Sequence, residues 1–495
     1  MVRLALGASV WALLAGSAGC SLSVDDLSGA GIGARCNVDT ECHAGFCDEG
    51  VCAASCTADA DCPAPAGCFD DRCALPLHAA ALWEGVVSGG EGWNLTHQEG
   101  MTYAASQLPY LSWVYEENIS SAEVGTIATE VDRQIASGAS VIVANSYNQQ
   151  ADLMVAADMH PDVKFLVGGG SASNGRNLVS FYSYFEQAWF TAGKVAALRA
   201  KKRIGMIVDL VAPDQVRAVN AFALGARSIN PDIVVQVEWL GFWLDYNSVP
   251  TFDYHGTKLF REELLTARMI EGGCEIIAHN SDNQRAVRYV ESKTMAGAVS
   301  GVLSIAANNR SGYRALTPEG PTGDPMETCM GSAYYNFGVQ HVHLLHSIHH
   351  DKLDASALVL DAMTSDPATS PVGFELNPVV GIDDSAARLM LKKVADAGPH
   401  AVFRGPYNTT GQRDRDDDGV ADDDQTVAEG ETLSEAEYSR VCWFAEGVVQ
   451  KSDPLDPASP DVDGMVPDGD VPPPSDMLGP PGAPPGVGVR CHDNL

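Results

Sequence analysis

Aromatic, amide and carboxylate side chains follow several short apolar segments of this chain. Aromatic faces stack on planar rings, amides read ring edges, and carboxylates accept hydrogen bonds from sugar hydroxyls or ring N–H groups. A purine or a nucleoside suits this combination. The candidate ligand-binding residues are Trp93, Asn94, Ser146, Tyr147, Glu186, Trp243, Asn280, Asp282 and Asn336. A single Trp is more often a core residue, so the hypothesis rests on the whole set.

The elements that must position these residues alternate between strand-like and helix-like patterns. The apolar runs are 140–145, 163–169, 203–209, 234–241 and 274–280, and the helix-like stretches are 186–200, 214–228 and 257–271. This alternation predicts an α/β fold with parallel sheets, and residues 80–451 are numerous enough for two lobes. Ligands bind at the carboxyl ends of such strands, where the candidate residues are expected.

The net charge narrows the range of partners. The chain has 495 residues and a formal net charge of −34. A field of this sign repels nucleic acid and anionic membrane surfaces. Neutral and cationic small molecules remain possible ligands.

The two ends of the chain predict export and an unstructured tail. Residues 1–19 have the charged start and the apolar stretch of a signal peptide, and Cys20 follows small residues as a lipidated N-terminus does. An ordinary signal peptide with a chance Cys is the alternative. Residues 20–35 form a linker, and the Pro- and Asp-rich residues 452–495 are expected to be disordered.

Cysteine spacing predicts a small disulfide-rich module at residues 36–73. Of the 13 Cys residues, eight lie there, in two repeats of the pattern C-x5-C, four or five residues, then C-x4-C. So short a segment cannot bury a core, and zinc sites favour closer Cys pairs and His ligands. The connectivity stays open. For the remaining Cys residues, a guess pairs Cys442 with Cys491 and Cys274 with Cys329.

Several segments, in order along residues 80–451, resemble the basic membrane protein (Med or PnrA-like) family of substrate-binding lipoproteins. They are "GWNLTHQEG" (92–100), "APDQVRAVNAFALGARSINPD" (212–232), "GFWLDY" (241–246), "VFRGPYNTTG" (402–411) and "CWFAEGVV" (442–449). The resemblance implies a two-lobed fold like that of type I periplasmic binding proteins. It also implies a purine or nucleoside ligand in an interlobe cleft and delivery to an ABC importer.

The same resemblance assigns roles within the cleft. It makes Trp243 the ring that stacks on the base, with Trp93 and Asn94 on the opposite wall, and Asn280 or Asp282 reaching polar ligand atoms. Nucleoside-binding members carry an acidic residue in the opening motif, where this chain is neutral around Asn94, and often another where it has "GGG" (168–170). These departures favour a free base over a nucleoside.

An acidic segment at 414–425 has the spacing of a calcium loop. Carboxylates alternate, a Gly follows, and a further carboxylate comes three residues later, but Gln425 occupies the last ligand position. A structural Ca²⁺ and a plain acidic turn are equally good interpretations. The possible ligands are Asp414, Asp416, Asp418 and Asp422.

No motif for catalysis is apparent. The sequence lacks G-x-S-x-G and H-E-x-x-H. The His-rich segment 341–350 places His346 and His350 on one helix face, where zinc is conceivable and a solvated face is commoner. We therefore predict a lipid-anchored, extracytoplasmic binding protein without enzymatic activity. The alternative is a surface sensor or adhesion protein without a transport role.

Overall fold

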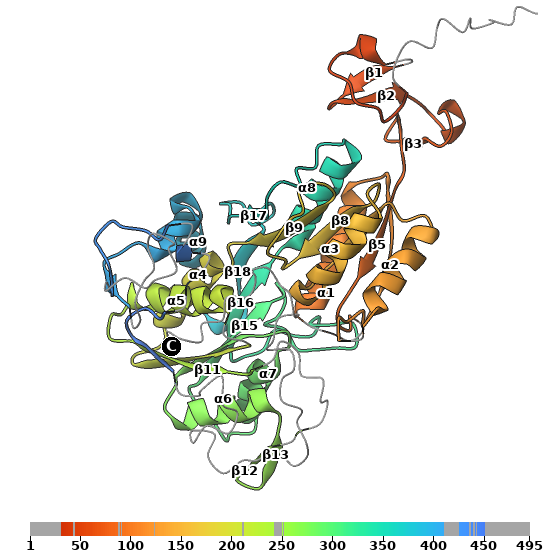
Figure 1. Ribbon diagram of the computed structural model, residues 1–495. Coiled ribbons are helices and arrows are strands. Elements are labelled where there is room, and N and C mark those ends of the chain that lie inside the picture. The colour runs from red at the N-terminus through yellow and green to blue at the C-terminus, as the bar shows by residue number, and fades with distance from the viewer. Residues whose placement is uncertain are drawn as a thin grey trace, which may run out of the picture. The chain divides into compact units, whose positions relative to one another are not determined.

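The computed structural model describes residues 31–42, 45–87, 90, 92–122, 124–209, 212–241, 250, 252–409, 425–434, 437–438, 441 and 443–450. Two compact units divide the chain, Met1–Leu75 and Pro76–Leu495 (Figure 1). Among the described residues, no helix is both long enough and apolar enough to cross a bilayer.

The first unit is a four-stranded antiparallel sheet held by disulfides. Its strands, in spatial order, are β1 (Phe46–Asp48), β2 (Val51–Ser55), β4 (Arg72–Ala74) and β3 (Gly67–Phe69). The disulfides are Cys36–Cys47, Cys42–Cys52, Cys56–Cys68 and Cys62–Cys73. Each repeat therefore joins its first Cys to its third and its second to its fourth, which confirms the predicted disulfide framework.

Both repeats also contain the same short 3₁₀ turn, η2 (Asp39–Glu41) in the first and η3 (Asp59–Asp61) in the second. Asp39 accepts a hydrogen bond from the Cys47 amide at 2.8 Å, and Asp59 accepts one from the Cys68 amide at 2.8 Å. The equivalent contacts show that the sequence repeat is a structural repeat.

The second unit begins with a six-stranded parallel sheet. In spatial order its strands are β6 (Leu111–Glu116), β5 (Leu77–Leu82), β7 (Val141–Ala144), β8 (Lys164–Gly168), β9 (Leu178–Ser183) and β17 (Val359–Asp361). Helices α1 (Trp93–Gln107) and α8 (Phe337–His349) cover one face, and α2 (Thr126–Ala136) and α3 (Gln150–Met159) the other. The strands are apolar on both faces because both are covered.

A seven-stranded sheet forms the second lobe. Its strands, in spatial order, are β18 (Val372–Leu376), β16 (Cys329–Tyr335), β15 (Leu303–Asn308), β14 (Ile276–Asn280), β10 (Arg203–Val208), β11 (Val234–Trp239) and β21 (Val448–Gln450). Only β18 runs antiparallel to its neighbour within this sheet.

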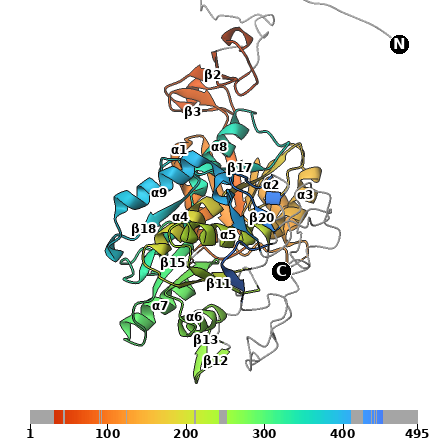
Figure 2. The same cartoon turned by 90° about the vertical axis from the view of Figure 1, so that its left-hand side faces the viewer.

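Helices also cover both faces of this second sheet. On one side are α4 (Glu186–Ala197), α5 (Pro213–Arg227) and α9 (Asp384–Ala397), and on the other α6 (Arg261–Glu271) and α7 (Arg285–Met295) (Figure 2). The backbones of α4 and α5 touch, since a Cβ added to Gly193 would lie 2.1 Å from the Phe222 carbonyl oxygen. The remaining short elements are η4 (Tyr147–Gln149), β12 (Phe252–Tyr254), β13 (Thr257–Leu259), η5 (Pro378–Val380), η6 (Pro399–Phe403), β19 (Tyr407–Asn408) and β20 (Thr426–Val427).

The chain passes between the two sheets three times among the described residues. It crosses after β9 to α4, after β16 to α8, and after β17 to β18. The two lobes are therefore interleaved in sequence, and the carboxyl ends of β9 and β16 lead directly into crossings. The predicted α/β fold with two parallel-sheet lobes is confirmed.

Three expectations from the sequence were wrong. The helix expected at 257–271 begins at Arg261, because Thr257–Leu259 pairs with β12 as an antiparallel strand. The guessed Cys274–Cys329 disulfide is absent, and both thiols are free and buried. Cys274 precedes β14 and Cys329 begins β16 with β15 between them, so their separation of about two strand spacings, roughly 9.5 Å, exceeds disulfide reach.

The His-rich segment is not a solvated face. His341 and His350 are buried on α8 or at its end. The Tyr110 ring stacks on His349, with ring centroids 3.7 Å apart, and its hydroxyl lies 2.9 Å from Nδ1 of His346. These side chains pack instead against the end of the loop before β6.

Candidate functional site

Several aromatic rings meet where the two sheets approach each other. Tyr182 is the second-last residue of β9, Tyr335 ends β16, and Trp93 begins α1. The rings of Phe185 and Phe337 stack on Tyr335, with centroids 3.9 and 5.0 Å away. The Tyr335 hydroxyl donates to the Tyr182 hydroxyl at 2.7 Å, which links the lobes. The Trp93 ring centroid lies 5.2 Å from that of Tyr335 and 6.2 Å from that of Tyr182.

Gly168 and Gly169, at the end of β8, have no side chains and so allow the Trp93 ring to pack against the sheet. A Cβ on Gly169 would lie 3.2 Å from Cζ2 of Trp93, and Gly169 has a φ of +74° that other residues seldom adopt. A Cβ on Gly168 would lie 2.4 Å from Cε1 of His97. The "GGG" segment therefore makes room for side chains of α1.

Asparagines behind the Trp93 ring hold the loops of the first lobe in place. The Asn94 side-chain oxygen accepts from Nδ2 of Asn145 at 2.7 Å and from the Gly85 amide at 3.2 Å. The Trp93 indole donates to the Asn145 carbonyl at 2.5 Å. Asn94, predicted to contact ligand, is thus positioned to orient the loop after β5.

The carboxylates of Glu84, Asp209 and Asp282 lie near the point where the backbones of the two lobes are in contact. A Cβ on Gly92 would lie 2.1 Å from the Asp282 carbonyl oxygen, so only Gly permits this approach. Burial, together with the charge of Glu84, raises the pKa of Asp282 to about 7. Burial and the charge of Asp282 hold the pKa of Asp209 well above its usual value.

A second group of charges lies beside the tyrosines. Glu186, the first residue of α4, is 3% exposed, and its Oε1 lies 4.0 Å from Nε of Arg217. Burial raises the pKa of Glu186 to about 7 although Arg217 acts in the opposite direction. Asp214, in the first turn of α5, raises the pKa of both Tyr182 and Tyr335 in addition to burial. Asp214 connects these charges with the carboxylates at Asp282, because its charge also raises the pKa of Asp209.

The other predicted residues have structural partners at the same sheet edges. Ser146 accepts from the Asn148 amide at 3.1 Å, and its neighbour Tyr147 is half-buried. Asn280 donates to Gln215 at 2.7 Å. Asn336 donates to the Ser370 carbonyl at 3.1 Å and lies at the second crossing between the lobes.

Some predicted residues lie outside the described residues. They are Cys20, Trp243, Asp414, Asp416, Asp418 and Asp422. Their roles in lipidation, ring stacking and calcium binding stay predictions.

Sequence reasoning missed six residues of this site, namely Glu84, Tyr182, Asp209, Asp214, Arg217 and Tyr335. Asp209 directly follows β10, so the rule of inspecting strand ends would have found it. Tyr182 and Tyr335 lie within strands, and nothing in their local sequence indicates that two different sheets bring them together.

Comparison with known families places most of these residues in one homologous segment. Residues 77–289 match the family described as ABC transporter substrate-binding protein PnrA-like. The match covers less than half of the chain, so the similarity to this family applies to the segment. The predicted resemblance is confirmed over this segment, which includes Glu84, Trp93, Tyr182, Asp209 and Asp282.

Two curated relatives align with a similar share of the chain. A putative ABC transporter glucose-binding protein of Haloferax volcanii is 27% identical over 211 residues, which is 42% of this chain and 49% of the relative. A purine-binding protein of Brucella abortus is 26% identical over 207 residues, 41% of this chain and 55% of the relative. The chain therefore spans about half the length of the curated relatives it matches.

Solved structures of solute-binding proteins cover more of the chain. An ABC transporter solute-binding protein of Conexibacter woesei aligns with 65% of this chain and 95% of its own, at 13% identity and a TM-score of 0.49. One from Aeropyrum pernix aligns with 64% and 85%, at 13% identity and a TM-score of 0.48.

Proposed function

We propose that this protein is an extracytoplasmic substrate-binding protein that binds a purine base or nucleoside between its lobes and delivers it to an ABC importer. The observation that carries the proposal is the set of rings from both lobes, Trp93, Tyr182 and Tyr335, beside carboxylates. Planar rings stack on aromatic faces, which the half-buried Trp93 and Tyr182 would offer, and carboxylates accept from ring N–H groups. The Tyr335 ring stacks on Phe185 and Phe337 and would support this wall from behind.

The lobe topology supports a binding role that involves closure. Three chain crossings join the lobes, and a tyrosine pair spans two strands that lead into crossings. Rigid lobes joined by a few short segments close around ligands by hinge motion. The PnrA-like family match and the purine-binding relative from Brucella abortus support the same function. We propose binding without turnover.

Ligand-induced stabilisation of the full chain tests the proposal. A ligand that binds only the folded state raises the unfolding temperature as its concentration exceeds the dissociation constant. We expect adenine, guanine, hypoxanthine or one of their nucleosides to raise it. If none does at about millimolar concentration, the purine proposal is overturned. A shift with glucose alone would instead favour the ligand class named for the Haloferax relative.

Variants of the aromatic residues show whether the ligand binds beside Trp93, Tyr182 and Tyr335. Trp93→Leu is expected to abolish the purine-induced shift, because the half-buried ring contributes to the aromatic set. Trp113→Leu is the matched control, since Trp113 is also half-buried but lies in the middle of the edge strand β6. Trp243→Ala is expected to act like Trp93→Leu. An unchanged shift in Trp93→Leu would place the ligand elsewhere.

Export and anchoring form a separate part of the proposal. Four disulfides in the first unit suit an oxidising compartment. We propose that Cys20 carries lipid after removal of residues 1–19. The wild-type protein is expected to partition into a detergent phase and Cys20→Ser into the aqueous phase. Equal partitioning of the two would contradict lipidation at Cys20.

A further inference from the structure

Asp209, Asp282 and Glu84 form an acidic cluster where the lobes touch. Asp209 follows β10 and Asp282 follows β14, and these parallel strands are neighbours, with Val208 opposite Asn280. Glu84 comes from the other lobe, after β5, and its Oε1 accepts from Nδ2 of Asn148 at 3.0 Å. Two sheets thus bring like charges together.

Asp209 is the member whose position is hardest to explain by structure alone. It is 3% exposed, and its Oδ1 has no hydrogen-bond partner among the described residues. A buried polar atom without a partner destabilises the fold, and more so when the group is charged. A buried carboxylate oxygen without a partner, beside two other carboxylates, is typical of a site that binds a ligand with hydrogen-bond donors.

No Lys or Arg is among the groups that shift the pKa of Asp209 or of Asp282. After burial, the charge of Asp282 has the largest effect on the pKa of Asp209 and raises it; the Ser281 hydroxyl lowers it, and the charges of Glu262 and Asp214 raise it less. The pKa of Asp282 is raised by burial and by the charge of Glu84. Glu262 has its own cation, with Nη1 of Arg285 at 3.4 Å. Arg217 is engaged elsewhere, by the Tyr438 carbonyl at 2.8 Å and by Glu186 at 4.0 Å.

The geometry separates two kinds of cation. Metal ions need ligand oxygens that converge on one point. Among the described residues, groups of three or more metal-type ligand atoms within 4.8 Å of one another do not include Glu84, Asp209 or Asp282. Spaced carboxylates instead suit an organic cation, whose charge and N–H groups are spread over several atoms.

We propose that the cluster of Glu84, Asp209 and Asp282 binds the positive charge of a cationic ring ligand held by Trp93, Tyr182 and Tyr335. The inference rests on the proposed function and specifies its substrate class as protonated or alkylated purine-type heterocycles. A backbone contact joins the two parts of the site, because Gly92, against Asp282, immediately precedes Trp93. The net charge of −34 would also draw such a ligand toward the protein.

Matched neutral and cationic probes test the charge preference. Adenosine is compared with 1-methyladenosine, whose ring is protonated at neutral pH, and guanosine with 7-methylguanosine, whose methylated imidazole ring is cationic. We expect the full chain to bind at least one cationic member about tenfold more tightly than its neutral partner, by calorimetry. The methyl groups occupy different ring positions, so one steric clash cannot affect both pairs.

Neutralised variants show whether these carboxylates cause the preference. Asp282→Asn and Asp209→Asn are each expected to reduce the cation-to-neutral affinity ratio toward one. Asp232→Asn should leave the ratio unchanged, because Asp232 is exposed and precedes β11 at the opposite edge of the same sheet. A preference retained in both cluster variants would overturn the inference.

Proton release gives a readout that packing changes would not mimic. Carboxylates with raised pKa values hold protons in the empty site and lose them when a cation binds. Binding enthalpies of the cationic probes should therefore depend on the ionisation enthalpy of the buffer. If neutral purines bind more tightly than both cationic partners, the inference fails while the proposed function stands. If no purine of either kind binds, the proposed function itself fails.

Discussion

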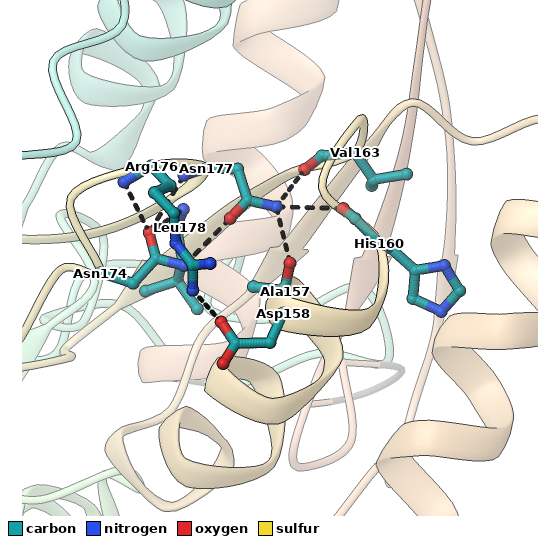
Figure 3. A network of polar contacts seen from close by, with 8 residues as sticks. All are labelled: Ala157, Asp158, His160, Val163, Asn174, Arg176, Asn177 and Leu178. Atoms are coloured by element: carbon teal, nitrogen blue, oxygen red, sulfur yellow. Dashed lines mark hydrogen bonds and ion pairs between the residues drawn. The ribbon is translucent and has the colours of Figure 1, made fainter.

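Two polar clusters of the second unit differ in whether their buried polar groups have hydrogen-bond partners. At the amino edge of β8 and β9, the 2% exposed Asn177 donates through Nδ2 to the carbonyls of Ala157, His160 and Val163 at 2.9–3.0 Å (Figure 3). Its oxygen accepts from Asn174 at 3.0 Å. Asn174 in turn accepts from the amides of residues 176–178 at 2.9–3.0 Å.

At the carboxyl edges, the acidic cluster of Glu84, Asp209 and Asp282 lacks such matching. Glu84 has a donor in Asn148, but Oδ1 of Asp209 has no hydrogen-bond partner among the described residues, and the charge of Asp282 raises the pKa of Asp209. The amide cluster is complete within the chain, which is typical of a structural role. The acidic cluster is incomplete, which is typical of a site that stabilises something other than the fold.

The largest effect is expected when the complete cluster is broken. Asn177→Ala leaves three carbonyls of the α3–β8 connection without their donor. We expect the free energy of unfolding to fall by about 3 kcal/mol, because buried groups lose their partners. Urea unfolding measures this change.

Arg176→Ala is the control within the same cluster. Arg176 pairs with Asp158, but both side chains are more than half exposed, and exposed ion pairs contribute about 1 kcal/mol at most. A loss as large as that of Asn177→Ala would mean that the amide network is not the stabilising part.

A change in the incomplete cluster should have the opposite sign. Asp209→Asn removes a buried carboxylate that other carboxylates repel. Without ligand, we expect the unfolding free energy at mildly alkaline pH to rise, because the variant no longer buries a charge there. Destabilisation of the ligand-free protein would show that Asp209 has a structural role, and the contrast between the two clusters would disappear.

The pH dependence sharpens the same contrast. Asp282 has a pKa of about 7 in the folded state and of about 4 when unfolded. The folded state therefore holds the proton more tightly, and stability falls as the pH rises between these values. Relative to wild type, Asp282→Asn should gain about 2 kcal/mol between about pH 5 and about pH 7. A difference that stays constant with pH would contradict the raised pKa.

The smallest effect is expected at the tyrosine pair that joins the lobes. Tyr335→Phe removes the hydroxyl that donates to Tyr182 at 2.7 Å. We expect a loss of about 1 kcal/mol, since one neutral hydrogen bond is removed and the ring stack on Phe185 remains. Tyr103→Phe, at an exposed position of α1, should cost less than about 0.5 kcal/mol. If both variants lose the same unfolding free energy, the hydrogen bond between Tyr335 and Tyr182 does not stabilise the protein measurably.

Much of the fold could be read from apolar runs. The run at 203–209 contains β10 and that at 234–241 contains β11, because strands covered on both faces are continuously apolar. Strand β13 was read as the start of a helix, since three residues are too few to show the alternation of a strand. Disulfide connectivity also needed the structure, because spacing alone permits several pairings.

The site was only partly predictable. Trp93, at the start of α1, and Asp282, just after β14, stay candidates for ligand contact. Four other candidates have partners within the protein that the sequence does not reveal, namely Asn94, Ser146, Asn280 and Asn336. Glu84 and Asp209 were passed over, since one carboxylate after a strand is common and only a neighbour from another strand makes it unusual.

By itself, the sequence determined the parallel α/β architecture, the repeated disulfide module, and the similarity of the segment 77–289 to the PnrA-like family, because these depend on local periodicity, spacing and motif order. Tertiary structure decided which side chains meet. Tyr182 and Tyr335 are 153 residues apart, yet their hydroxyls are 2.7 Å apart. Asp209 became distinctive only when folding buried it beside Asp282 and opposite Glu84. Burial and proximity are properties of the packed chain, so no local pattern records them.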